Sequence, residues 1–214
     1  MDLYRLLLTG ESAFAAEGEC ASRLARRYAY VLTIDADTRM LPGTARRLIG
    51  TIAHPVNRAR EENGRRRGYA LIQPRMELSL RAARSPFIRL MAGEGGVDSY
   101  PVSVSDLYQD ATGQGIFGGK GIVDVAAFAK ALEGKLPDNA ILSHDLIEGL
   151  YAGSGFASDI ALYEGFPSTL GGYIKRLERW TRGDWQLLRW IVRRELSALD
   201  RFKLIDNLRR SLVA

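Results

Sequence analysis

The chain has 214 residues, 46% of them apolar and 26% charged, which is enough to bury the core of one sizeable domain. One cysteine, Cys20, excludes a disulfide framework and a cysteine-based zinc site, and two histidines, His54 and His144, exclude a histidine-rich metal centre. The net charge of +5 favours an anionic ligand or surface: nucleotide phosphates, acidic lipid headgroups or, on charge alone, nucleic acid. No run reaches the roughly 18 apolar residues of a membrane-spanning helix, and the first residues lack the basic segment of a signal peptide.

The segment that organises the chain is residues 30–38, Tyr-Val-Leu-Thr-Ile-Asp-Ala-Asp-Thr, which follows a predicted surface helix over residues 19–27. Its β-branched and aromatic residues predict a buried strand that ends at Asp35 and Asp37. Acids at the end of such a strand lie at the carboxyl edge of an α/β sheet, where these folds bind ligands. Paired carboxylates are hard oxygen ligands, so the segment predicts an Mg²⁺ or Mn²⁺ site. A solvated turn after the strand is the alternative.

A helix is predicted next, from a cap at Gly43 or Thr44 to His54, where Pro55 ends it. Its inner face is expected to carry Ala45, Leu48, Ile49 and Ile52. An arginine-rich turn or flexible loop over residues 57–68 follows. Its arginines could touch phosphates, although a solvated charged loop explains them more simply.

The strand predicted over residues 69–76 also ends in polar side chains. These side chains are Gln73 and Arg75, and Pro74 between them is expected to stop the strand pairing. A helix over residues 80–91 is then expected to break or restart at Pro86, and a short strand is expected over residues 102–107. The apolar side of that helix would carry Leu80, Phe87, Leu90 and Met91.

A glycine-rich loop spans residues 113–121 and matches the dinucleotide pattern G-x-G-x-x-G by letter. The context does not fit, because residues 108–112 are polar rather than a buried strand, and Gly121 after Lys120 excludes a phosphate-binding P-loop. The glycines predict close backbone approach to something bulky such as a sugar, with Lys120 reaching a phosphate or a hydroxyl. A plain flexible turn is an equal alternative. A helix capped by Asp124 follows, with Val125, Phe128 and Leu132 inward and Gly134 at its end.

A second acidic signal lies at residues 141–149. Ser143 is expected to cap a helix whose first turn holds Asp145 and, on the same face, Glu148. Asp145 is therefore a candidate general base near the metal site. The alternative is that these acids only stabilise the N-terminus of the helix electrostatically.

The last third contains a predicted strand over residues 158–163 and then a basic helix. Arg176 and Arg179 share one face of this helix and could grip a diphosphate, while Trp180 offers a surface on which a sugar can stack. A basic surface helix with a buried tryptophan is an equal alternative. Residues 201–212 predict an amphipathic helix that lies on a membrane surface or packs as an ordinary helix. Its apolar face is expected to carry Leu204, Ile205, Leu208 and Leu212.

The order of these motifs resembles the processive inverting glycosyltransferases with a GT-A fold, which include cellulose, chitin and hyaluronan synthases. Their pattern is D-x-D, then an acidic motif ending in Asp, then Q-x-x-R-W. This chain has the full first motif, the Asp of the second at Asp145, and R-x-x-R-W with Arg176 in place of the leading Gln.

A closer resemblance, from about Tyr30 to the end, is to the glycosyltransferase domain of cyclic β-1,2-glucan synthases. It rests on several segments in order: residues 35–39, 53–58, 72–75, 104–110, 119–122, 142–146 and 182–188.

The resemblance implies a GT-A-like (Rossmann-like) mixed sheet flanked by helices, with residues 1–200 forming a partial domain that lacks the N-terminal nucleotide-binding strands. Residues 201–214 would form the amphipathic helix. The donor would be UDP-glucose, the acceptor a β-glucan and the cofactor Mg²⁺ or Mn²⁺, with no nucleic acid bound. The location would be the cytoplasmic face of the bacterial inner membrane, within a larger membrane protein.

The resemblance also implies a role for each candidate residue. Asp37 would hold the metal, with Asp35 nearby contacting uridine or ribose, and Asp145 would deprotonate the acceptor. The remaining substrate-binding candidates are Gln73, Arg75, Lys120, Arg176, Arg179 and Trp180.

Two other classes compete with this interpretation. A non-catalytic binding module with the same fold would keep the residues but not the turnover. A haloacid-dehalogenase-type phosphatase needs D-x-D-x-T/V, and here Thr38 directly follows Asp37 with Arg39 in the required place, so that class is rejected.

Overall fold

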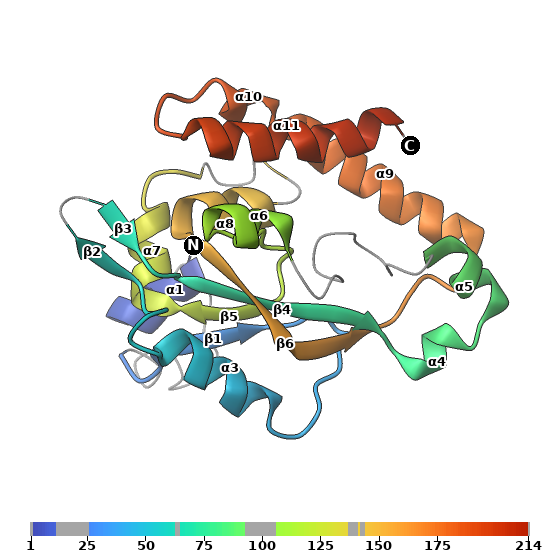
Figure 1. The fold of residues 1–214 in the computed structure, drawn as a ribbon, viewed down its shortest axis with the longest axis horizontal. Coiled ribbons are helices and arrows are strands. Elements are labelled where there is room, and N and C mark those ends of the chain that lie inside the picture. Colours follow the sequence, from blue (N-terminus) through green and yellow to red (C-terminus); the bar gives the residue numbers. More distant parts are fainter. Residues whose placement is uncertain are drawn as a thin grey trace.

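The computed structural model describes residues 2–11, 26–62, 65–92, 106–136, 141 and 144–213. Its centre is a four-stranded sheet with helices on both faces (Figure 1). In spatial order the strands are β1 (Tyr30–Thr33), β5 (Gly121–Asp124), β4 (Leu71–Leu78) and β6 (Ser154–Glu164). The predicted α/β class, with a mixed sheet flanked by helices, is therefore confirmed. The GT-A fold in particular stays a prediction.

The directions of the strands decide where the site lies. β5 pairs antiparallel with both β1 and β4, whereas β4 and β6 pair in parallel. Thr33, the last residue of β1, is opposite Gly121, the first residue of β5. The residues that follow β1 and the residues that precede β5 therefore meet at one edge of the sheet.

Each face of the sheet has its own apolar core, because side chains alternate along a strand. Leu71 and Val123 face a cluster that includes α7 (Val125–Leu132), α8 (Asp145–Ala152), α10 (Leu188–Ile191) and α11 (Ala198–Val213). Ile72 and Ile122 face a smaller cluster with Leu48 of α3 (Thr44–Ala53). The sheet is thus the middle layer between α3 and the other four helices (Figure 1).

The remaining elements lie around this sandwich. They are α1 (Asp2–Thr9), the paired strands β2 (Arg60–Glu62) and β3 (Arg65–Arg67), α4 (Leu80–Ala83), α5 (Pro86–Ala92), α6 (Leu107–Thr112) and α9 (Leu170–Gln186). Among the described residues, no helix combines the length and the apolar character that crossing a membrane requires.

Several local predictions are confirmed. Asp124 caps α7, accepting a hydrogen bond from the amide of Ala127, and the inward residues predicted for α7 are buried. The helix predicted over residues 80–91 is interrupted before Pro86, where α5 begins. The strand predicted over residues 158–163 is present and longer, and the basic helix begins already at Leu170.

Other predictions about strands and loops are wrong. β1 is a half-exposed edge strand rather than a buried one, since it has a neighbour on one side only. β4 does not stop pairing at Pro74 but continues to Leu78, with its register shifted between Pro74 and Arg75. Proline lacks an amide hydrogen, which explains an irregularity there without an end to the strand. The expected loop over residues 57–68 contains the β2–β3 pair.

Predictions of inward-facing residues also fail where amphipathic patterns are imperfect. Ala45 and Ile49 of α3 are exposed, as are Leu80 and Leu90. In α11 the expected apolar face is divided: Leu204 is buried and Leu208 half-buried, whereas Ile205 and Leu212 are exposed. α11 packs against the rest of the protein, as the ordinary-helix alternative predicted, and it buries polar side chains as well.

Three predictions fall wholly or largely outside the described residues. They are the helix expected over residues 19–27, of which only the end is described, the strand expected over residues 102–107, of which the first part is not described, and the cap expected at Ser143. The described part of the second segment is not a strand, because Asp106 caps α6 and Leu107 begins it.

Candidate active site

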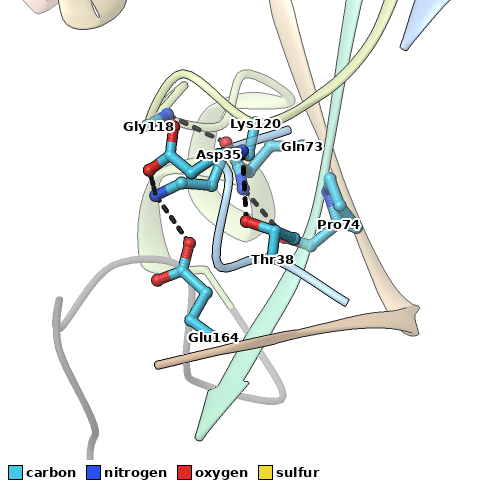
Figure 2. Close-up of polar contacts among 7 residues, drawn as sticks. All are labelled: Asp35, Thr38, Gln73, Pro74, Gly118, Lys120 and Glu164. Atoms are coloured by element: carbon cyan, nitrogen blue, oxygen red, sulfur yellow. Dashed lines mark hydrogen bonds and ion pairs between the residues drawn. The ribbon is translucent and has the colours of Figure 1, made fainter. Parts of the chain in front are cut away.

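An ammonium group lies between two carboxylates at the edge of the sheet where β1 ends. The Lys120 Nζ is 3.1 Å from an Asp35 carboxylate oxygen and 2.6 Å from Glu164 Oε1 (Figure 2). The side chain of Lys120 is 18% exposed and that of Glu164 is 9% exposed, whereas Asp35 is open to solvent. Burial alone would lower the pKa of Lys120, but the ion pairs with Glu164 and Asp35 outweigh it and raise the pKa above its usual value.

The chain after β1 folds back onto the end of β6, and this brings Glu164 to the site. The Arg39 amide donates to the Tyr163 carbonyl at 2.7 Å, and the Tyr163 amide donates to the Arg39 carbonyl at 2.9 Å. Within the turn, the buried Thr38 hydroxyl accepts a hydrogen bond from the Asp35 amide at 3.2 Å. A Cβ added at Gly165 would lie 3.0 Å from an Asp37 carboxylate oxygen, so Asp37 lies directly against the residue that follows Glu164.

The glycine-rich loop brings Lys120 to this edge. The Gly118 amide donates to Gln73 Oε1 at 2.9 Å, and the Gln73 side-chain amide donates to the Pro74 carbonyl at 2.9 Å (Figure 2). Gln73 is therefore buried inside the protein, where it holds the loop against β4. Because both of its hydrogen-bonding groups are used here, its direct contact with a substrate stays a prediction.

Two glycines of the loop are required by close contacts within the protein. A Cβ at Gly121 would lie 2.2 Å from the Ile72 carbonyl oxygen. Gly119 has φ +87°, and a Cβ there would lie 2.8 Å from an Asp145 carboxylate oxygen. The bulky group that the glycines approach is thus the protein itself, and the approach to a sugar stays a prediction. The same contact places Asp145 against the residue that precedes Lys120.

Asp145 lies in the first turn of α8, as predicted, and is its first residue, with His144 at the capping position making no side-chain hydrogen bond to the helix. One turn further, burial and the neighbouring Asp145 raise the pKa of Glu148 to about 7. His144 Nδ1 lies 3.7 Å from Glu148 Oε1. Burial and the charge of Glu148 raise the pKa of Tyr4, on α1, to about 12. The first turn of α8 therefore contains one partly exposed acid, Asp145, and one acid that resists ionisation.

The α9 side of the site is formed by stacked side chains. The Arg176 guanidinium lies 5.5 Å from the Trp180 ring centroid and 5.9 Å from that of Phe166, and Phe166 stacks on Tyr173 at 5.5 Å. Arg176 Nη1 is buried and has no hydrogen-bond partner among the described residues. Arg179, one turn along, is exposed. Phe166 follows Glu164 by two residues and so connects this side to the sheet edge.

The structure thus pairs Asp35 with Lys120, places Asp37 against Gly165 and Asp145 against Gly119, and puts Gln73 behind the glycine-rich loop. Arg75 is used differently, because its guanidinium pairs with Glu77 at 2.5 Å. Sequence reasoning missed Glu164. It lies at the end of a predicted strand, and the rule that selected Asp35 would have found it too.

A divalent metal at this edge of the sheet would need ligands besides the protein's own side chains. Within the described ranges, no three His, Cys, Asp or Glu side chains gather to hold a metal alone. Mg²⁺ usually binds through one or two carboxylates, and substrate phosphates and water complete its shell. Asp35 and Asp37 fit that role beside a diphosphate, with Asp35 also paired to Lys120.

Comparison with known proteins gives one clear similarity. No family model matches the chain. Over 192 residues, 86% of this chain, the sequence is 45% identical to the cyclic beta-(1,2)-glucan synthase NdvB of Rhizobium meliloti (strain 1021). This chain resembles one part of a glucan synthase. The chain spans only 7% of the length of NdvB, and the identity supports the family resemblance drawn from the motifs.

Proposed function

We propose that this chain is the part of a cyclic β-1,2-glucan synthase that transfers glucose from UDP-glucose to a growing glucan, with inversion at the anomeric carbon. The observation that carries the proposal is the ion pair of Lys120 with Asp35, together with the contact of Asp145 with Gly119, the neighbour of Lys120 in the chain. The similarity to NdvB supports the glucan as product.

On the donor side, the residues of the sheet edge would bind the diphosphate of UDP-glucose. Asp37 would hold Mg²⁺ or Mn²⁺, with Asp35 near the uridine or ribose, and the metal would act as a Lewis acid on the leaving group. Lys120 would place a fixed positive charge beside the same phosphates, and the buried Glu164 keeps its ammonium in place. Gln73 supports the loop, and Arg75 is a weaker candidate for contact with the donor.

On the acceptor side, Asp145 would act as general base. It would take the proton of the 2-hydroxyl of the acceptor glucose while that oxygen attacks the anomeric carbon and the bond to UDP breaks. The raised pKa of Glu148, about 7, limits the negative charge beside Asp145. Arg176 and Arg179 would neutralise the departing UDP, and Trp180 would line the acceptor site.

The proposal includes a membrane location, at the cytoplasmic face of a bacterial inner membrane as part of a larger protein. α11 supports this with exposed apolar side chains at Phe202, Ile205 and Leu212. Basic helices with such side chains bind membrane surfaces.

Calorimetry with UDP and Mn²⁺ tests the donor site. The wild type should bind UDP, and Asp37→Ala should bind it more weakly by at least about tenfold, because a carboxylate ligand of the metal is lost. Equal binding by both proteins, or binding by neither, contradicts the metal assignment.

A turnover assay with labelled UDP-glucose and a β-1,2-linked acceptor separates an enzyme from a binding module without turnover. Asp145→Asn should lower the rate by about 10²–10⁴, the usual contribution of a general base, while it leaves UDP binding unchanged. An unchanged rate would exclude Asp145 as the base.

A further inference from the structure

Lys203, on α11, is a buried lysine that the proposed chemistry does not use. The residue is 1% exposed, and its Nζ donates to the carbonyl oxygens of Gln114 at 2.8 Å and Gly115 at 3.3 Å. The same ammonium lies 5.1 Å from the ring centroid of Tyr108. Burying an ammonium is costly unless its donors are used, and here main-chain oxygens of one loop use them.

The two carbonyls belong to the first half of the glycine-rich loop that ends at Lys120. Other hydrogen bonds then guide the loop across the protein: the Gly115 amide donates to the Ser154 carbonyl at 2.9 Å, and the Ile116 amide donates to the Asp106 carboxylate at 3.4 Å. The Gly118 amide donates to Gln73, as described above. Lys203 therefore fixes the start of a loop whose end forms the sheet-edge side of the site.

The same face of α11 also holds α9. Asn207 donates from its side-chain amide to Asp184 Oδ1 at 2.7 Å, and the Ser211 hydroxyl donates to Asp184 Oδ2 at 2.9 Å. Lys203, Asn207 and Ser211 are spaced by four residues, so they lie in one row on the helix. Asp184 belongs to α9, which carries Arg176 and Trp180. One row of polar side chains thus connects the glycine loop with α9.

We propose that Lys203 is a positioning residue of the transferase, which acts by holding the glycine loop and, through it, Lys120 at the donor diphosphate. This inference rests on the proposed function. Under the proposed function Lys120 lies at the phosphates of the donor, whereas the Asp145 carboxylate belongs to α8. Because Lys203 holds the loop that carries Lys120, its loss should affect donor binding. Loss of the ammonium should raise the KM for UDP-glucose and leave kcat nearly unchanged.

Three variants test the proposal. Lys203→Met keeps the length of the side chain and removes its donors, and Lys203→Arg keeps a charged donor in the same place. Lys130→Met is the matched control, because Lys130 is on the surface of α7, 78% exposed and 3.1 Å from Glu61. If Lys203→Met does not fold, the comparison of Lys203→Arg with the wild type still decides, because an altered donor geometry must loosen the same loop.

Amide hydrogen exchange measured by NMR reports the loop directly, without a ligand. In Lys203→Met the protection of the Gly115, Ile116 and Gly118 amides should fall by about tenfold or more, while the amides of Leu48 and Ile52 in α3 keep theirs. In Lys203→Arg the loss should be smaller, and Lys130→Met should match the wild type. Calorimetry with UDP and Mn²⁺ should give a Kd for Lys203→Met several-fold above that of the wild type.

The outcomes are distinct. Unchanged loop protection, an equal fall of protection in the loop and in α3, or a lower kcat at an unchanged KM would each overturn the proposal. Failure of the proposed function would show itself differently, as an absence of UDP binding by the wild type, and the exchange data would still report whether Lys203 holds the loop.

Discussion

The two sides of the candidate site are held together by different interactions. At the sheet edge, Lys120 is fixed by ion pairs of 3.1 and 2.6 Å and lies beside the contact of Gly119 with Asp145. On α9, Arg176 is held by the faces of two aromatic rings, and its buried Nη1 lacks a hydrogen-bond partner in the described part of the chain.

The sheet-edge side is therefore formed before a ligand arrives. On the α9 side, a ligand would complete the interactions of Arg176. Ion pairs and close contacts fix the direction of a side chain, whereas stacking on a ring leaves the donors of a guanidinium available. Buried donors are almost always paired, so under the proposed function Arg176 Nη1 would be available to the diphosphate. Variants on the two sides should therefore differ in stability.

Removal of the ammonium at the sheet edge should cost the most stability. Lys120→Met leaves the carboxylate of Glu164, 9% exposed, without its partner, which typically costs about 3–5 kcal/mol of unfolding free energy. The exposed Lys130→Met should cost about 0–1 kcal/mol, and urea unfolding of both variants measures the difference. Equal costs would show that the sheet-edge side is not formed in advance.

The first turn of α8 should make stability depend on pH. The folded pKa of Glu148 is about 7, against 4.5 in the unfolded chain, so the folded state holds a proton that the unfolded state releases. This contribution is complete below about pH 4.5 and is lost as the pH rises to about 7, with a total of about 3 kcal/mol. Unfolding measured at several pH values should show a smaller decline over this window in Glu148→Gln. An identical decline in both proteins would mean that Glu148 titrates normally.

The contact between the glycine loop and Asp145 can be isolated by a pair of variants. Gly119→Ala and Gly113→Ala both place alanine at a positive φ, +87° and +71°, but a Cβ at Gly113 meets nothing within 4 Å. Gly113→Ala should therefore cost only the backbone strain, about 1–2 kcal/mol, and Gly119→Ala should cost about 1–3 kcal/mol more and lower turnover, because Asp145 must move. Thermal unfolding and the turnover assay measure the two effects. If both variants behave alike, Gly119 and Asp145 are not in close contact.

The α9 side should show the smallest stability effects. Arg176→Met removes the contacts with Phe166 and Trp180 and should cost about 1 kcal/mol, whereas the exposed Arg179→Met should stay within about 0.5 kcal/mol. Both should weaken UDP binding measured by calorimetry, Arg176→Met by more. A larger loss of stability in Arg176→Met than in Lys120→Met would reverse the comparison between the two sides.

The sequence was sufficient wherever local chemistry decides the structure. An Asp that caps α7 and a Pro that interrupts a helix each act within a few residues, and both predictions were confirmed. The strand before Asp35 is also present, although it is half-exposed and not buried as predicted. Asp35 and Asp145 were recognised as site candidates for the same reason, because strand ends and helix starts present their side chains outward.

The sequence was insufficient wherever residues far apart in the chain determine the structure. Nothing near Lys120 or Glu164 indicates that they pair, because their contact depends on β5 running against β1 and on Arg39 bridging to Tyr163. The apolar pattern of α11 likewise could not show that its inner face contains a buried lysine, since the acceptors come from a loop 88 or 89 residues earlier.

The antiparallel β5 has a further consequence for how the protein is synthesised. A ribosome makes β1 and β4 well before β5, the strand that lies between them, and before β6, the parallel neighbour of β4. Thr33 and its carbonyl partner Gly121 are 88 residues apart, and pairings of this length form slowly because a long loop must close first. The nascent chain therefore carries β1 without its partner until residue 124 has left the ribosome, and β4 with an unpaired edge until residue 164 has followed. A chaperone that shields such strand edges would have its greatest effect during this interval, before the residues of the candidate site can come together.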